Sequence, residues 1–339
     1  MNSTTPQQVI RDLIKERLPS KPIFAPIIFT LSAKMENMPI RIFLSNPTKI
    51  VSAIRELQKF LRNDGVVAYF DTTLEAEACG CALDWEYMSP KVVSHLPKDE
   101  RSFAEISRKK ILDKGRMPVA IEVVKRLRAL IRGGEVIIGS ITGPLTLPFK
   151  LWGDVGGSDL YSEMLEAAGS IVLQSTRAFC EAGVNILLIV EESMPELNYE
   201  LFQDKLHGIL STLCNVAKYY EVLAALMIRG PLNEEQLGYF LDLAPSCFIF
   251  CNVADLDLVE SLAIEKNKTF GLPLPLHLFN LKREEIEPEI RRLIPKGSRN
   301  LTRCCLITTE WEIPYDVNLE GFNENIKIVR RSIYTLWSK

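Results

Sequence analysis

Several short apolar runs in this chain end abruptly in charged or amide side chains. The run at residues 66–70 is followed at once by Asp71, and the run at residues 185–190 by Glu191 and Glu192. Buried parallel strands are near-continuous apolar runs, and in α/β proteins the chemistry collects just beyond their carboxyl ends. Further polar residues at or just beyond such ends are Glu75, Glu77, Arg229, Asn252, His277, Glu310 and Glu312. The pattern predicts that these polar tips together hold a substrate.

The residue types at these tips indicate acid–base chemistry beside an anion-binding group. A carboxylate at the mouth of a largely apolar barrel can have a raised pKa and donate a proton, and Asp71, Glu191 and Glu310 are the candidates. Arg229 is the candidate for holding a substrate anion, because its planar guanidinium matches a carboxylate. The other predicted substrate-binding residues are Lys34, Phe29, Tyr69, Met227, Asn252, His277 and Trp311. This combination suits an aromatic acid.

Several alternatives concern the same tips. Glu191, Glu192, His277 and Glu310 have side chains that can bind zinc, so they form the predicted ligand set if a metal is present. Equally, Arg229 could pair with Glu191 or Glu192 and hold the rim. His277 could be structural, and Glu75 and Glu77 could simply cap a helix.

The elements that must position these residues alternate along the chain. Strands are predicted at residues 22–29, 66–70, 136–144 (strand with its following loop), 185–190, 222–228, 247–251, 269–274 and 304–308. Helical periodicity is predicted at residues 7–18, 48–61, 118–132, 159–182, 198–220, 234–243, 256–266, 283–293 and 318–336. Residues 31–45 are expected to be a loop over the mouth, and residues 84–116 a lid or substrate loop. The pattern predicts one α/β domain over residues 1–339, a (β/α)8 TIM barrel with an N-terminal helical extension at residues 1–21.

The composition limits which cellular compartment and which classes of binding partner are expected. The chain of 339 residues is 47% apolar and 24% charged, with a formal net charge of -3, so nucleic acid is not an expected partner. No apolar stretch approaches the roughly 20 residues that span a bilayer. Eight scattered cysteines, including the weak Cys79-x-Cys81 signal, and no secretory signal favour a reduced, cytoplasmic setting.

Three motifs carry a family resemblance. They are Gly139-Ser-Ile-Thr-Gly-Pro-Leu-Thr-Leu147 with Gly153, Arg116-Met-Pro-Val, and Glu75-Ala-Glu-Ala-Cys-Gly-Cys81. The chain resembles the uroporphyrinogen decarboxylase superfamily from about residue 45 to residue 331, and the last motif is most similar to its corrinoid-dependent methyltransferase branch. The resemblance implies the same barrel, an acid near Glu191, and a methyltransferase of one-carbon metabolism that works with a corrinoid (cobalamin) carried by a partner protein.

Two departures from the family patterns shape the expected function. Porphyrinogen decarboxylases have an arginine-rich motif after the first strand, whereas here residues 30–37 hold only Lys34, with no arginine before Arg41. Relatives that activate a thiol with zinc place His-x-Cys after the fifth strand and a Cys after the eighth. The matching positions here are Met227, Arg229 and Trp311, which are not ordinary zinc ligands. Activation of a thiol by zinc at these positions is therefore not expected, while zinc at a different site stays open.

The expected function is the first methyltransferase of an O-demethylase system. Such an enzyme transfers a methyl group from a methoxylated aromatic compound to the Co(I) corrinoid of its partner, which requires in-line positioning and protonation of the leaving phenolate. The alternatives are a methyl-corrinoid to acceptor methyltransferase, a decarboxylase (carboxy-lyase) of a small acid, and a barrel without catalysis that binds a tetrapyrrole or a partner protein.

Overall fold

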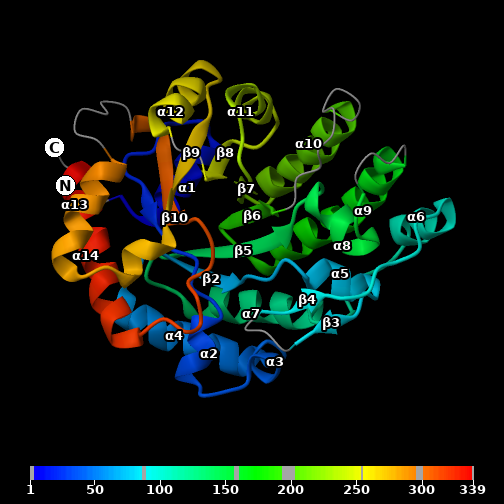
Figure 1. Cartoon of the computed structure of the whole chain (residues 1–339), viewed down its shortest axis with the longest axis horizontal. Coiled ribbons are helices and arrows are strands. Elements are labelled where there is room, and N and C mark those ends of the chain that lie inside the picture. The colour runs from blue at the N-terminus through cyan, green and yellow to red at the C-terminus, as the bar shows by residue number, and fades with distance from the viewer. Residues whose placement is uncertain are drawn as a thin grey trace.

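A parallel sheet curls into a nearly closed barrel at the centre of the molecule (Figure 1). The computed structural model describes residues 4–85, 89–155, 160–192, 203–252, 255–294 and 301–337. The eight strands are β1 (Ile23–Phe24), β2 (Gly65–Tyr69), β5 (Val136–Thr142), β6 (Ile186–Glu191), β7 (Leu223–Arg229), β8 (Cys247–Cys251), β9 (Thr269–Leu274) and β10 (Cys304–Thr309). Their order is β1-β10-β9-β8-β7-β6-β5-β2. The predicted (β/α)8 barrel is confirmed.

The barrel closes through a side chain at the seam between β1 and β2. The Asp64 N–H donates to the carbonyl oxygen of Phe24 at 3.0 Å, and the Phe24 N–H donates to the Asp64 carboxylate at 2.9 Å. The predicted first strand at residues 22–29 is shorter in the structure, because Pro26 cannot donate a ladder hydrogen bond.

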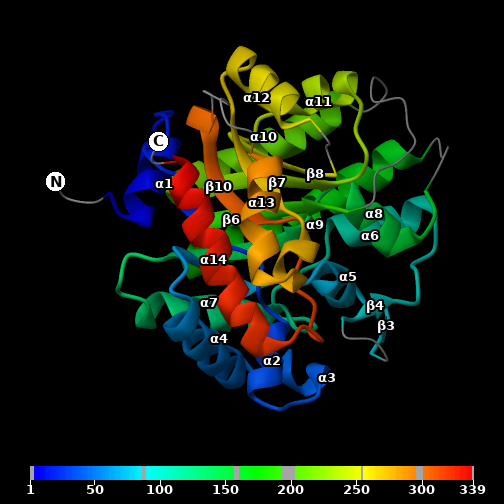
Figure 2. The same ribbon diagram turned by 60° about the vertical axis from the view of Figure 1, so that its left-hand side comes forward.

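Helices cover the outside of the barrel. They are α1 (Pro6–Ile14), α4 (Pro47–Leu61), α5 (Leu74–Cys79), α7 (Met117–Leu130), α8 (Thr146–Trp152), α9 (Tyr161–Ala182), α10 (Gln203–Tyr219), α11 (Glu234–Leu241), α12 (Leu256–Glu265), α13 (Arg283–Leu293) and α14 (Leu319–Trp337). Figure 2 shows α14 lying along α13 and α4, both of which it contacts. None of the described helices is long and apolar enough to cross a membrane.

Helix α4 illustrates how local sequence sets an element. The Asn46 side chain accepts from the Lys49 N–H at 3.1 Å and Pro47 occupies the first turn, which together start the helix. Its apolar stripe, which includes Ile54 and Leu57, is buried against the barrel. Arg62 ends the helix in the left-handed region, with φ 50°.

Two segments differ from the predicted loops. Residues 31–45 contain the short helices α2 (Leu31–Met35) and α3 (Ile40–Phe43), which are too short to show helical periodicity in sequence. Residues 84–116 contain α6 (Glu100–Ser107) and the strand β4 (Lys91–Val92), which pairs with β3 (Leu83–Asp84).

Some helix ends also differ. The N-terminal helix ends at Ile14 rather than residue 18, since Glu16 takes a left-handed conformation with φ 59°. Residue 159 and residues 198–202, predicted as helical, lie outside the described residues.

Strands β8 and β9 separate toward their carboxyl ends. They pair only at Cys247 with Thr269 and at Phe248 with Phe270, although both strands continue. Two short 3-10 helices occur in this part of the sequence: η2 (Leu276–Asn280) follows β9, and η3 (Leu301–Arg303) precedes β10. The gap between the strands opens into a cavity lined by residues of both strands.

Candidate active site

A pocket of about 420 Å³ lies at the carboxyl ends of the strands, and we call it the mouth pocket. Its lining includes Asp71, Glu192, Arg229, Trp311 and Glu312, which follow or end four different strands. The segment at residues 89–92 forms part of its rim. The volume falls in the range of small-molecule pockets and would hold a single-ring substrate. The structure therefore gathers at one site many of the predicted strand tips.

A stacked pair forms one wall of the mouth pocket. The guanidinium carbon of Arg229 lies 3.9 Å from the centre of the Trp311 ring. The Trp311 ring in turn meets Phe70 edge to face, with ring centres 5.1 Å apart. A stacked guanidinium is held in one plane and keeps its N–H edge for an anion. Arg229 forms no ion pair with either glutamate among the described residues, so the rim-pairing alternative is not observed.

Glu312 supplies an acid–base group in the same pocket. Its carboxylate accepts a hydrogen bond from the Thr30 N–H, which fixes its orientation. Burial raises the pKa of Glu312 from 4.5 to about 7, and the nearby negative charge of Asp71 adds to the rise. A carboxyl group with this pKa can carry and release a proton near neutral pH.

Asp71 is held by a buried arginine rather than left free. Arg116 is 4% exposed, and one of its terminal nitrogens pairs with the Asp71 carboxylate. The Arg116 Nε also donates to Glu77 at 2.8 Å, and Thr73 donates to Asp71 from both its N–H and its hydroxyl. The Arg116 guanidinium lies 4.7 Å from the centre of the Trp85 ring. Asp71 is thus held in one position at the edge of the pocket by Arg116 and Thr73.

Glu75 and Glu77 are not the solvated cap that one alternative foresaw. Glu75 is fully buried, and its carboxylate accepts from the Thr142 hydroxyl at 2.7 Å. Burial raises the pKa of Glu75. Glu77 is a partner of Arg116. Glu75 therefore ties α5 to the end of β5, and Glu77 ties α5 to the start of α7.

Glu191 is sealed behind the pocket instead of lining it. It is 1% exposed, and its two oxygens accept from the N–H groups of Leu145 and Thr146 at 2.9 and 2.7 Å. Burial raises the pKa of Glu191 to about 8, although these N–H groups lower it. Gly143 makes room for the carboxylate, since a Cβ there would lie 2.2 Å from the Glu191 Cδ.

Glu192 belongs to a polar cluster on the opposite side of the mouth pocket. It pairs with Lys150 of α8 and accepts from the Thr72 hydroxyl at 2.9 Å. Both members of the pair are mostly buried, with side-chain exposures of 16% and 19%. His95 lies next to this cluster, with its Nδ1 3.2 Å from the Lys150 carbonyl oxygen.

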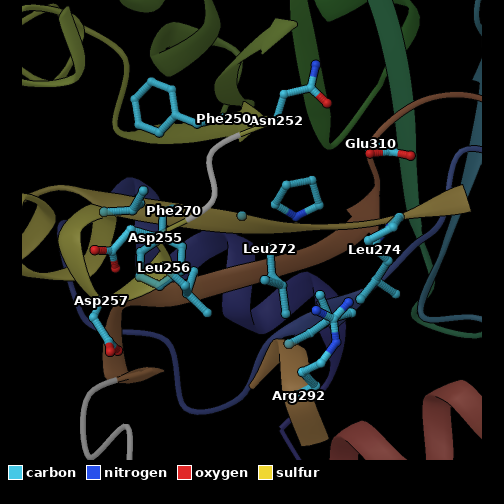
Figure 3. Close-up of a pocket in the computed structure, with 15 residues that line it drawn as sticks. Phe250, Asn252, Asp255, Leu256, Asp257, Phe270, Leu272, Leu274, Arg292 and Glu310 are labelled. Atoms are coloured by element: carbon cyan, nitrogen blue, oxygen red, sulfur yellow. The ribbon is translucent and has the colours of Figure 1, made fainter. Parts of the chain in front are cut away.

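Two predicted site residues lie in a different cavity, which we call the side cavity (Figure 3). This cavity of about 340 Å³ occupies the gap where β8 and β9 separate, and Asn252 and Glu310 line it. Figure 3 shows both with Arg292 around the cavity. Glu310 accepts from the Leu276 N–H at 3.0 Å. The structure thus separates Glu310 from Glu312, two residues apart, into two cavities.

The remaining predicted substrate-binding residues do not line the mouth pocket. Phe29, Tyr69 and Met227 are fully buried, with the Phe29 and Tyr69 rings 4.8 Å apart. Lys34 donates from its Nζ to the Val317 carbonyl oxygen at 2.9 Å. His277 is exposed, with its Nε2 3.2 Å from the Glu289 carboxylate.

The alternative metal ligands are not gathered in one place. The oxygens of Glu191 accept from backbone N–H groups, Glu192 pairs with Lys150, and His277 faces Glu289. Across the described ranges no group of three or more His, Cys, Asp or Glu side chains could hold a metal ion. The side chains that the structure describes therefore do not fit a zinc centre.

Sequence reasoning missed four residues that shape the pocket: Lys150, Arg116, His95 and Phe70. Arg116 stood in a recognised motif, but its contact with Asp71 joins residues 45 positions apart. Phe70 and Tyr69 are adjacent and both apolar in character, so only the orientation of the strand shows which one faces the pocket. Lys150 on α8 had no distinguishing signal.

Comparison with known proteins places this geometry in a family. The family model described as uroporphyrinogen decarboxylase (URO-D) matches residues 26–332. The chain is 28% identical over 140 residues to a Methylcobamide:CoM methyltransferase MtbA of Methanosarcina mazei and 26% identical to that of Methanosarcina acetivorans. In each case the match covers 39% of this chain and 40% of the relative, so the chain spans about two fifths of the length of these curated relatives.

Solved structures show the same fold. A methyltransferase from Methanosarcina mazei superposes with a TM-score of 0.81 and 17% identity, covering 99% of this chain and 100% of that one. A B12-independent methionine synthase from Shewanella sp. W3-18-1 gives a TM-score of 0.58 at 13% identity, covering 87% and 89%. Since the family model spans most of the barrel and all of the mouth pocket, the chain belongs to the uroporphyrinogen decarboxylase family.

Proposed function

We propose that this protein is a corrinoid-dependent methyltransferase. It transfers a methyl group from a methoxylated aromatic acid to the Co(I) corrinoid of a partner protein, as the first component of an O-demethylase system. The observation that carries the proposal is the Arg229 guanidinium stacked on Trp311 in the mouth pocket. By the family resemblance, relatives that activate a thiol have zinc ligands at the positions that Arg229 and Trp311 occupy here.

The pocket walls suit the proposed donor. Trp311 and Phe70 offer aromatic surfaces for the ring of a methoxybenzoate, and Arg229 offers a planar pair of N–H donors for its carboxylate. A substrate anchored at both its ring and its acid would have one orientation, which is the requirement for in-line methyl transfer.

Glu312 supplies the proton that the leaving group needs. Breaking the bond between the methyl carbon and the ether oxygen leaves a phenolate, which a neutral carboxyl group can protonate. The pKa of Glu312, about 7, keeps a large share of this side chain protonated near neutral pH. Glu191 is not the proposed donor, because it is 1% exposed and does not line the mouth pocket.

The corrinoid supplies a Co(I) nucleophile that accepts the methyl group when its carrier protein is bound. The mouth pocket, at about 420 Å³, suits the small donor rather than a macrocycle. The open rim at the carboxyl ends of the strands is therefore the expected docking face for the carrier. Methyl transfer as such is supported by the names of the Methanosarcina relatives.

A second candidate is transfer in the other direction, from a methyl-corrinoid to an acceptor. The relatives' printed activity, methylcobamide to CoM, favours it. Arg229 could hold an anionic acceptor, but an acceptor thiol would need activation by some group other than the zinc ligands considered above.

The test is a methyl-transfer assay with a reduced corrinoid protein and a panel of methoxybenzoates. We expect methyl-corrinoid and a free phenol in equal amounts, detected by absorbance and chromatography. The same assay run with methyl-corrinoid and candidate acceptors distinguishes the second candidate. Absence of transfer in either direction across the panel, or release of carbon dioxide without any corrinoid, would refute the proposal.

A further inference from the structure

A second large pocket lies at the opposite end of the barrel from the mouth. We call it the basal pocket, and its volume is about 700 Å³. It is lined by the C-terminal ends of α4 and α7 and by the segments that lead into β2 and β5. In this fold the catalytic groups lie at the other face, so the basal pocket is separate from the proposed reaction.

The basal pocket is rich in cations that lack partners. Arg55, Lys59, Arg62 and Arg132 line it, against the acidic side chains of Asp64 and Glu135. Lys59 pairs with Glu56, whereas the three arginines form no ion pair in the described part of the chain. Three unpaired guanidinium groups around one concavity attract an anion, and their planar forks match phosphate oxygens.

Two buried side-chain oxygens of residues that line the pocket have no hydrogen-bond partner. Asn63 is 5% exposed and lines the pocket, and its side-chain oxygen has no hydrogen-bond partner. One carboxylate oxygen of Glu135 is also buried and also has no hydrogen-bond partner. A buried acceptor without a donor costs free energy, so both oxygens call for a ligand with donor groups.

The backbone adds donors at the same place. Gly133 and Gly134 line the pocket, and their N–H groups donate to no other group of the described chain. Gly134 has φ 91°, a conformation that glycine adopts without strain. Successive free N–H groups in such a turn suit an anion.

We propose that the basal pocket binds a small phosphorylated molecule that also carries hydroxyl groups. The arginines and the glycine N–H groups take the phosphate, and the hydroxyl groups donate to Asn63 and Glu135. One oxygen of the Asp64 carboxylate, Oδ2, accepts from the Phe24 N–H and the Tyr334 hydroxyl, so this side chain is held at the seam between β1 and β2.

Calorimetry at constant ionic strength tests the site, with ribose 5-phosphate, inorganic phosphate and ribose as probes. We expect ribose 5-phosphate to bind at one site, and Arg55→Gln combined with Arg132→Gln to weaken it at least about tenfold. Asn63→Ala should weaken ribose 5-phosphate while leaving inorganic phosphate unchanged, since only the hydroxyl groups reach Asn63.

The matched control removes two charges elsewhere. Arg108 and Lys110 are exposed and form no ion pair among the described residues, so Arg108→Gln with Lys110→Gln should leave binding unchanged. Circular dichroism checks that each variant is folded. Equal losses in both double variants, unaltered binding without Arg55 and Arg132, or no saturable binding of either phosphate probe would overturn the proposal. No methyl transfer is measured, so the result is independent of the proposed function.

Discussion

Two residues of the mouth pocket divide the proposed chemistry between them. Arg229 has a fixed charge and a fixed plane on the Trp311 ring, whereas Glu312 has a charge that changes near neutral pH. Binding and proton transfer should therefore respond differently to substitution.

Replacing Arg229 by Ala should mainly raise the KM for carboxylated substrates. Loss of a charge-assisted hydrogen-bond pair costs about 1.5–3 kcal/mol, which corresponds to roughly 10- to 100-fold. Steady-state kinetics with a methoxybenzoate measure the effect, and methoxybenzene, which lacks the acid, is the matched control. A similar rise for both compounds would contradict the assigned role.

Replacing Glu312 by Gln should lower kcat by roughly 10²- to 10⁴-fold, the range of general acid catalysis, with a small change in KM. In the unchanged protein kcat should fall as the pH rises through about 7, because the donor loses its proton. The pH profile of kcat measures this. A profile that keeps the same falling limb in the Glu312→Gln variant would exclude Glu312 as the donor, and Glu191→Gln is then the comparison to make.

Glu191 predicts a pH dependence of stability. Its pKa is raised from 4.5 to about 8, so the folded protein binds its proton more tightly than the unfolded chain does. The contribution of Glu191 to the free energy of unfolding is therefore fully present below pH 4.5 and is lost as the pH rises through about 8. Urea unfolding across this range should show a shallower decline in Glu191→Gln. An identical decline would contradict the raised pKa.

At the scale of elements, the turn from β5 into α8 builds the cradle for Glu191. The N–H groups of Leu145 and Thr146 point at its carboxylate, and the absence of a side chain at Gly143 leaves the space. The position of an acid on β6 thus depends on the backbone after β5.

Gly143→Ala tests this packing. The new Cβ would lie 2.2 Å from the Glu191 Cδ, so the carboxylate must move and the protein should lose about 1–3 kcal/mol of unfolding free energy. Gly208→Ala in α10 is the control, because a Cβ there meets nothing within 4 Å and should stabilise the helix by ~0.5–1 kcal/mol. Urea unfolding measures both. Equal stability changes in the two variants would show that position 143 accommodates a Cβ without displacing Glu191.

At the scale of the whole molecule, one carboxylate links the two ends of the chain. Asp64 joins β1 to the segment before β2 and also accepts from the Tyr334 hydroxyl on α14. Arg330 on the same helix donates to the Leu61 carbonyl oxygen at 3.0 Å. The last helix therefore secures the seam where the barrel closes.

Tyr334→Phe removes one of these links without changing the shape of the ring. The loss of a hydrogen bond to a partly buried carboxylate should cost roughly 1.5–3 kcal/mol of unfolding free energy. Chemical denaturation measures the loss. Tyr219→Phe is the control, since Tyr219 is 81% exposed, and should change stability little. Equal unfolding free energies of the two variants would show that the Tyr334 hydroxyl on α14 does not stabilise the seam.

The sequence by itself determined the architecture. Apolar runs at eight places become buried strands, and the helical stripes between them become the outer layer, because both follow from local periodicity and burial. It also placed Arg229, Trp311, Asp71 and Glu192 at strand tips, and the structure gathers all four in the mouth pocket.

Only the tertiary structure decided which tip faces which cavity. Glu310 and Glu312 are equivalent in sequence, yet one lies in the side cavity and the other in the mouth pocket. Glu191 is sealed by the turn after β5, and Arg116 reaches Asp71 from a distant segment. These outcomes depend on the separation of β8 and β9, on strand orientation and on contacts between segments far apart in the chain. Such features leave no local periodicity to read.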